Sequence, residues 1–190
     1  RKHGYYTQLL GTKRRLPQIY SNDKQEVAYA IRLGLNFPCQ GAAANMTNFG
    51  AILVYWLMRQ GKLPRMLEVA TVHDAAYFYS KPEYINTWTV FKIWDILRNP
   101  STKKYFGFQV DDVDMSMDFS IGRSMAEELP FIPGYDYRKM LQPDFSVEEY
   151  MEEHKKYKNV IIKDYPKLFS KEIKQYEEDF KGKLRLHWLP

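Results

Sequence analysis

Cysteine and long apolar runs are scarce in this sequence. Its 190 residues include a single cysteine, Cys39, which excludes a disulfide framework and an all-cysteine metal site. A reducing, cytoplasmic location is therefore expected. The longest apolar run, Gly50 to Met58, is too short to cross a bilayer. No signal peptide opens the chain, and its first residue is Arg1 rather than Met, so we expect a piece of a longer or processed protein.

Acidic residues are few in the first part of the chain. The sequence carries 28 Lys and Arg against 23 Asp and Glu, a net charge of +5, which by itself is a weak sign of a polyanionic partner. From Arg1 to Gly41, however, seven basic residues stand against two acids, whereas from Asp144 to Arg185 each sign occurs ten times. A nucleic-acid surface is therefore expected near the N-terminus, with a merely solubilising surface as the alternative.

The rest of the composition is that of a globular protein. Hydrophobic residues make up 45% and charged residues 27%, a balance that excludes wholesale disorder. Gly11 divides Tyr5 to Ile19 into two short extended pieces, and Thr12 to Arg15 is expected to be a basic loop between them. Candidate N-caps for the next helix are Ser21, Asn22 and Asp23.

Two helices are predicted before residue 61. The first runs from Lys24 to Leu35, and Pro38 is expected to end or kink it, because the residue before a proline avoids the helical region. The second, from Gln40 to Gln60, is closed by Gly61. It is apolar nearly all round, which predicts burial inside a domain.

A β-hairpin and a further helix follow. Leu67 to Val72 and Ala75 to Tyr79 are rich in β-branched and aromatic residues and predict two strands. His73 and Asp74 lie between them and form a polar tip. Pro82 to Arg98 predicts an aromatic-rich helix.

A third strand is predicted from alternation of apolar and polar residues. The apolar members are Val113, Met115, Met117, Phe119 and Ile121, and the polar ones are Asp112, Asp114, Ser116, Asp118 and Ser120. This period of two marks a strand with one buried face, which Gly122 ends.

The sequence predicts an α/β (α+β) fold in two parts. A domain boundary is expected between Pro130 and Gly134, so that residues 1–130 form one unit and 131–190 a helical, charged extension. Ser146, before Glu148 and Glu149, resembles a helix start. The extension, helical from Ser146 to Lys181 and broken by Pro166, is assigned no function and is expected to be a solvated helical cap or a packing arm.

Three polar residues in the first sixty are candidate DNA contacts. Arg32, Asn36 and Gln40 are four residues apart and would share one face of a continuous helix. Their donors suit the DNA minor groove, where every base pair offers acceptors. The alternative is a polar helix edge in water, which the spacing alone favours.

The polar tip of the predicted hairpin is a candidate metal site. A tight turn would expose the carboxylate of Asp74 and hold it in place, as a Mg²⁺ site with few protein ligands requires. His73 beside it would act as a donor or a positioned acid. The alternative is an aspartate that caps its own turn, a common use of the residue.

Taken in order, three stretches resemble the C-terminal part of the family A DNA polymerases, the bacterial polymerase I type that includes phage replicases. They are Gly11 to Pro17 (GTKRRLP), Arg32 to Ala44 (RLGLNFPCQGAAA) and Thr71 to Ala75 (TVHDA). The resemblance covers about Tyr5 to Gly122. It implies the palm of such an enzyme, with the base of its fingers in residues 1–130.

The resemblance assigns a role to each candidate. Asp74 matches the second catalytic aspartate, in motif C, which ligates two divalent ions, and His73 matches a residue at the primer terminus. Arg32, Asn36 and Gln40 match the family's minor-groove and template–primer contacts. Phosphate contacts are implied for Lys13, Arg14 and Arg15. The implied partners are primer–template DNA and deoxynucleoside triphosphates, and the implied cofactor is Mg²⁺.

Two departures from the family pattern matter. Ala75 stands where the family usually has a glutamate, which removes a carboxylate from the site. The first catalytic aspartate (motif A) and the fingers helix of motif B belong upstream of these residues.

Asp118-Phe119-Ser120 faintly resembles motif A, but it follows motif C and lacks the next glutamate and arginine. Three further acids, Asp111, Asp112 and Asp114, are read as edge-strand charges.

The expected activity is template-directed DNA synthesis that needs an upstream portion or a second subunit carrying motifs A and B. The charged tail and Ala75 favour a phage-type enzyme acting in the host cytoplasm. One rival is a non-catalytic duplex-binding subunit derived from a palm. Another is an interaction protein that uses the Tyr-rich tail. RNA synthesis is a third alternative, because single-subunit RNA polymerases share the palm, although Asn36 to Ala42 favours DNA.

Overall fold

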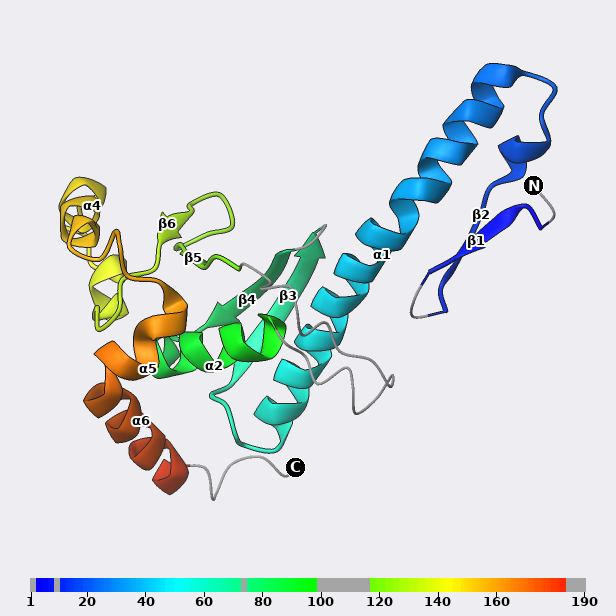
Figure 1. Ribbon diagram of the computed structural model, residues 1–190. Coiled ribbons are helices and arrows are strands. Elements are labelled where there is room, and N and C mark those ends of the chain that lie inside the picture. Colours follow the sequence, from blue (N-terminus) through cyan, green and yellow to red (C-terminus); the bar gives the residue numbers. More distant parts are fainter. Residues whose placement is uncertain (1–2, 9–10, 73–74, 99–116, 184–190) are drawn as a thin grey trace.

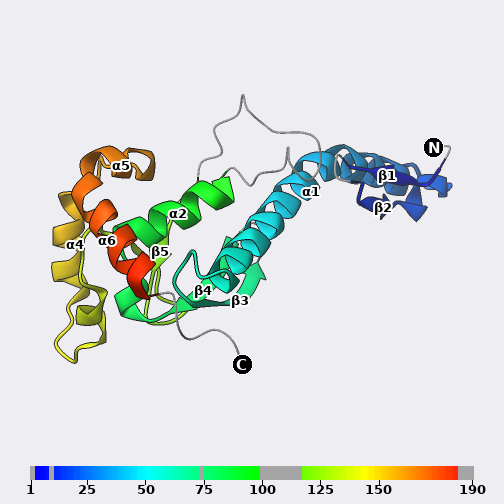
Figure 2. The same ribbon diagram turned by 90° about the horizontal axis from the view of Figure 1, so that it is seen from below.

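The computed structural model describes residues 3–8, 11–72, 75–98 and 117–183. A long helix, α1 (Lys24–Arg59), joins two regions of the molecule. Its N-terminal half projects outward with a small hairpin beside it, and its C-terminal half reaches a second hairpin and helix α2 (Thr87–Arg98) (Figure 1). The helices of the last third lie on the far side of α2 from α1, as a second view also shows (Figure 2). Helices and short antiparallel sheets confirm the predicted mixed fold class.

The N-terminal hairpin pairs β1 (Tyr5–Thr7) with β2 (Lys13–Arg15) in antiparallel register. Gly11 has a φ of +82°, a left-handed conformation that favours glycine in a turn. The prediction of a basic loop from Thr12 to Arg15 is therefore corrected. The turn includes Gly11, and Lys13 to Arg15 form a strand. A short 3₁₀ helix, η1 (Pro17–Tyr20), leads from the hairpin to α1.

Helix α1 is continuous through Pro38, so the helix end predicted at that residue is wrong, and the alternative of a kink there stays a prediction. A proline removes one backbone hydrogen bond and disturbs one turn, whereas the other turns of this 36-residue helix keep theirs. The ends agree with the sequence. The Asp23 carboxylate accepts a bond from the Gln25 amide at 2.8 Å, and Gly61, with a φ of +69°, ends the helix.

Helix α1 buries different sides in its two halves. Val27 and Gly34 face the N-terminal hairpin region, where Leu16 lies against Gly34. Val54 packs instead with Trp88 and Leu97 of α2. At about 3.6 residues per turn, Val27 and Val54 are about seven and a half turns apart and therefore point in opposite directions.

The second half of α1 is apolar nearly all round but buries only one side, so the expected burial inside a domain is corrected. Ile52, Tyr55 and Trp56 are about half exposed or more. The helix buries one side at a time and is not enclosed by the domain.

The second hairpin agrees closely with its prediction. It pairs β3 (Met66–Val72) with β4 (Ala75–Ser80), with a bulge between Glu68 and Ala70. Met66 and Phe78 pack from its inner face against the core shared by α1 and α2. A 3₁₀ turn, η2 (Pro82–Tyr84), precedes α2, so the predicted helix from Pro82 begins later, at Thr87.

The third predicted strand is described in part. Residues 117–121 alternate between half-buried and exposed, with Met117, Phe119 and Ile121 turned inward, as the sequence pattern predicts. Within the described residues of this stretch, β5 (Ser120–Ile121) pairs with β6 (Leu129–Pro130) in antiparallel register. The acids Asp111, Asp112 and Asp114 lie outside the described residues, whereas Asp118 is exposed.

The C-terminal third is a series of short helices. They are η3 (Tyr137–Leu141), α4 (Val147–Lys155), η4 (Ile162–Asp164), α5 (Tyr165–Leu168) and α6 (Ser170–Lys183). Ser146 caps α4, since its hydroxyl accepts a bond from the Glu149 amide, which confirms the predicted helix start. Pro166 stands in the first turn of α5.

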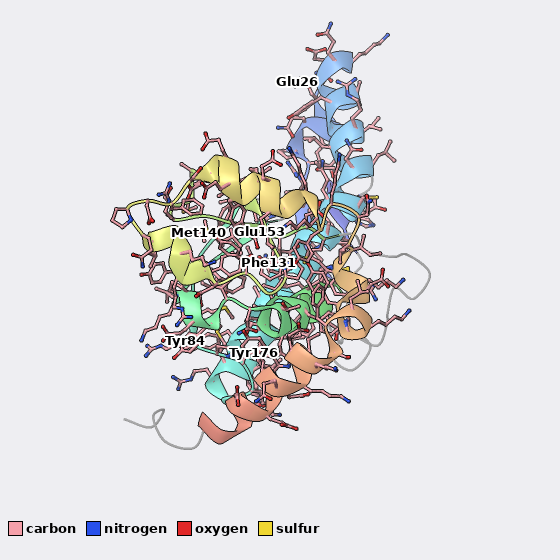
Figure 3. The ribbon with its side chains drawn as sticks, turned by 90° about the vertical axis from the view of Figure 1, so that its left-hand side faces the viewer. Glu26, Tyr84, Phe131, Met140, Glu153 and Tyr176 are labelled. Atoms are coloured by element: carbon pink, nitrogen blue, oxygen red, sulfur yellow. The ribbon has the colours of Figure 1, made fainter. Side chains whose placement is uncertain are left out.

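A tyrosine-rich core holds this third against α2. Tyr137 and Tyr150 are almost fully buried and pack with Ile132 and with Val90 of α2. Figure 3 shows Phe131 and Met140 of this region well away from Glu26, which marks the projecting half of α1. The predicted boundary near Pro130 is not tested by this packing and stays a prediction.

Burial disfavours ionisation of the tyrosines in this core. The hydroxyl of Tyr137 accepts a bond from the Ile132 amide at 2.8 Å and donates one to the Ile132 carbonyl at 3.0 Å. Desolvation raises the pKa of Tyr137 far above its usual value and that of Tyr150 to about 12. Within the described part of the chain, no helix is both long and apolar enough to cross a membrane.

Candidate nucleic-acid interface

The predicted row of donors lies on one exposed side of α1. Arg32, Asn36 and Gln40 are all exposed, and the continuous helix places them one above another. We call these three residues the donor row. Asn36 is about five turns from Val54 and therefore points to the side on which α1 meets α2 and the second hairpin. The row belongs to the half of α1 that projects outward in Figure 1.

The three basic residues of β2 are exposed and lie on the opposite side of α1. The hairpin is fixed to α1 by Arg14, whose guanidinium lies over the ring of Phe37 at 5.8 Å, and by a bond from the Asn45 amide to the Thr12 hydroxyl at 3.2 Å. Asn36 and Val27, which faces the hairpin region, are about two and a half turns apart and point in opposite directions. The donor row and the basic strand are thus on opposite sides of one helix.

Gly41 allows this close packing. A methyl group at Gly41 would lie 2.3 Å from Oε1 of Gln8. Gln8 is buried, and this oxygen has no hydrogen-bond partner in the described structure. Glycine at this position of α1 lets the end of β1 approach the helix backbone.

The tip of the second hairpin is the expected metal site. Strands β3 and β4 reach it at Val72 and Ala75, which are paired neighbours. The two candidates between them, His73 and Asp74, lie outside the described residues. Among the residues that are described, no three His, Cys, Asp or Glu side chains gather to form a metal site.

The outer face of this hairpin is apolar and exposed. Leu67 and Tyr79 are directly paired across the strands and are 63% and 71% exposed. Val69, at the bulge, is also exposed. In the described part of the chain, β3 and β4 pair only with each other. A two-stranded sheet is marginal in water without further packing; the inner face of this hairpin packs on the core shared by α1 and α2, whereas its outer face is exposed.

Sequence reasoning missed one feature of the interface. Tyr5 is exposed beside the basic strand, with the Lys13 ammonium 5.1 Å from its ring centroid. The signal was in the sequence, since Tyr5 precedes the basic residues at hairpin spacing. It is visible only once β1 is known to pair with β2.

Comparison with known proteins identifies related sequences. The sequence profile of DNA polymerase family A matches residues 1–127. DNA polymerase I of Mycobacterium leprae is 40% identical over 79 residues, 41% of this chain and 8% of that protein. DNA polymerase I of Mycobacterium tuberculosis H37Rv is 37% identical over 83 residues, 43% and 9% of the two chains. The alignments thus span less than a tenth of these relatives. No solved structure matches this chain.

Proposed function

This chain belongs to DNA polymerase family A, and we propose that it is the duplex-holding part of the palm of an enzyme that extends a DNA primer on a template. The observation that carries the proposal is the continuity of α1. One unbroken helix holds Arg32, Asn36 and Gln40 in an exposed row, and donors in such a row can bond acceptors of the minor groove at any base pair.

Motif C of the proposed site is the tip of the second hairpin. Asp74 would hold Mg²⁺, and His73 would meet the primer end. The described residues beside them, Val72 and Ala75, carry no ligating group, so this tip alone is an incomplete ligand set for two ions. Divalent ions bound at such a site stabilise the attacking and leaving oxygens of nucleotidyl transfer. The remaining carboxylate would come from motif A, outside this chain.

The proposed partner is therefore an upstream portion, on the same polypeptide or on a second subunit, that carries motifs A and B. The exposed apolar face at Leu67, Val69 and Tyr79 supports this, because a soluble protein tends to cover a contiguous apolar face. The match of this chain to less than a tenth of its relatives agrees with it. A phage-type origin stays a proposal that rests on Ala75 and the charged tail.

The metal role is tested by Asp74→Ala in the assembled polymerase, with Asp118→Ala as the matched control. Loss of the metal-binding carboxylate should abolish primer extension and leave affinity for primer–template within about twofold. The control removes an exposed aspartate that we assign no role, and it should extend at the normal rate. Unchanged extension by Asp74→Ala would favour the rival reading, a non-catalytic duplex-binding subunit.

The donor row is tested by Asn36→Ala combined with Gln40→Ala. Each lost donor removes a hydrogen bond of about 0.5–1.5 kcal/mol, so duplex affinity should fall about 5- to 150-fold. The fall should be equal for unrelated sequences, since the groove pattern is nearly uniform. Asn48→Ala, an exposed amide elsewhere on α1, is the control and should bind normally. A double variant that binds duplex as tightly as the control would contradict the role of the row.

A further inference from the structure

One exposed face of the N-terminal hairpin combines an aromatic ring with two cations. Tyr5 is the direct cross-strand partner of Arg15, and Lys13 is that of Thr7. Directly paired residues project to the same face of an antiparallel ribbon. Tyr5, Lys13 and Arg15 therefore share one face, which we call the Tyr5 face. All three residues are exposed, and the exposed fraction of Tyr5 is 43%.

The Tyr5 face points away from α1. Arg14, the next residue along β2, projects to the other face and lies over Phe37 of α1. The ring of His3 lies 5.8 Å from that of Tyr5 and extends the aromatic surface. Nothing in the described structure covers this face, and no carboxylate within it forms an ion pair with Lys13 or Arg15.

The segment that forms this face is basic. The first 22 residues contain five Lys and Arg and no Asp or Glu. A face of this kind attracts a polyanion, and an exposed tyrosine among the cations adds a surface on which a base can stack. Stacking requires a base that is not held in a duplex, so this combination suits a single strand better than a double one.

The geometry of α1 separates this face from the donor row. The hairpin lies on the side of α1 that Val27 faces, and Asn36 points to the opposite side. A duplex seated on the donor row is therefore across the helix from the Tyr5 face. A strand that reaches the Tyr5 face must have left the duplex.

We propose that the Tyr5 face binds single-stranded DNA, with a base stacked on the Tyr5 ring and phosphates held by Lys13 and Arg15. On the proposed polymerase function, on which this inference rests, the bound segment is template that has not yet been copied. The face thus has a partner different from the duplex expected at the donor row.

The test measures binding of the whole 190-residue chain to a labelled 12-nucleotide oligo(dT) and to a DNA duplex of equal length, by fluorescence anisotropy. Tyr5→Ala should weaken binding of the single strand about 5- to 150-fold, the range that loss of one stacked base gives. Duplex binding should change by less than twofold. Tyr5→Phe keeps the ring and should bind the single strand almost as tightly as the unchanged protein.

A second variant tests the charges independently of the ring. Lys13→Gln with Arg15→Gln should reduce the slope of log K against log salt for the single strand by about 1.4. Unchanged single-strand binding by Tyr5→Ala, in a protein whose circular dichroism is unchanged, would overturn the proposal. So would an equal loss of duplex binding, or equally Tyr5-dependent binding of a polyglutamate peptide. The assay involves no catalysis, so this inference and the polymerase function can fail separately.

Discussion

At the residue scale, the phenolic hydroxyl of Tyr137 is the clearest point on which the C-terminal core depends. It bonds both the amide and the carbonyl of Ile132, and all of these groups are buried. Tyr137→Phe leaves the buried Ile132 amide unpaired, while the Ile132 carbonyl keeps a bond from the Tyr135 amide at 3.3 Å, and it should lower the free energy of unfolding by about 1–3 kcal/mol, measured by urea denaturation. Tyr79→Phe, at an exposed position, should change it by less than about 0.5 kcal/mol. Equal stability of the two variants would contradict this account.

Single residues of the interface were predictable where their chemistry is local. The spacing of Arg32, Asn36 and Gln40 predicts a shared face because helical periodicity alone sets it. The stacking of Arg14 on Phe37 was not predictable, since it requires that the hairpin dock on α1. The structural setting of His73 and Asp74 lies outside the described residues, and their roles stay predictions.

At the scale of elements, the crossing of α1 and α2 depends on Gly50. A methyl group there would lie 2.8 Å from Cδ2 and 3.1 Å from Cα of Leu97. Gly50→Ala gains about 1 kcal/mol of helix propensity, but the backbone of α2 must shift, and overpacking of this kind costs about 1–3 kcal/mol. A lower urea midpoint is expected, whereas Asn48→Ala, exposed on the same helix, should keep it. A Gly50→Ala protein with a higher urea midpoint would contradict this account, because it would show that α2 can shift without loss of stability.

Elements were predicted well where a local signal ends them and poorly where packing decides. Asp23, Gly61 and Ser146 mark helix ends correctly because capping is local. The helix end predicted at Pro38 was wrong because the turns around it outweigh the bond that proline lacks. The burial of Gln40 to Gln60 was misread because the sequence does not show that α2 and the second hairpin cover only one side of this half of α1.

At the scale of the whole molecule, the buried tyrosines predict loss of stability in alkali. The pKa of Tyr150 is about 12 in the folded protein, and that of Tyr137 is raised as well, against about 10 in an unfolded chain. Above pH 10 the unfolded chain therefore binds fewer protons than the folded one, and stability falls as pH rises.

The contribution of Tyr150 should be fully present below pH 10 and lost between about pH 10 and 12, whereas that of Tyr137 should go on falling above this range. Urea denaturation at a series of pH values measures it. Tyr150→Phe removes one of the titrating groups and should flatten the decline over this range. A free energy of unfolding that stays constant from pH 10 to 12 would contradict the burial of these hydroxyls.

The most direct test of the central claim is primer extension by residues 1–190, alone and with the segment of the native protein or complex that carries the motif A aspartate. The account predicts no extension by the chain alone, because its hairpin tip offers one aspartate where two are needed. Extension should appear when the upstream segment is added and vanish again with Asp74→Ala. Extension by the chain alone would contradict the claim that this is one part of a polymerase active site.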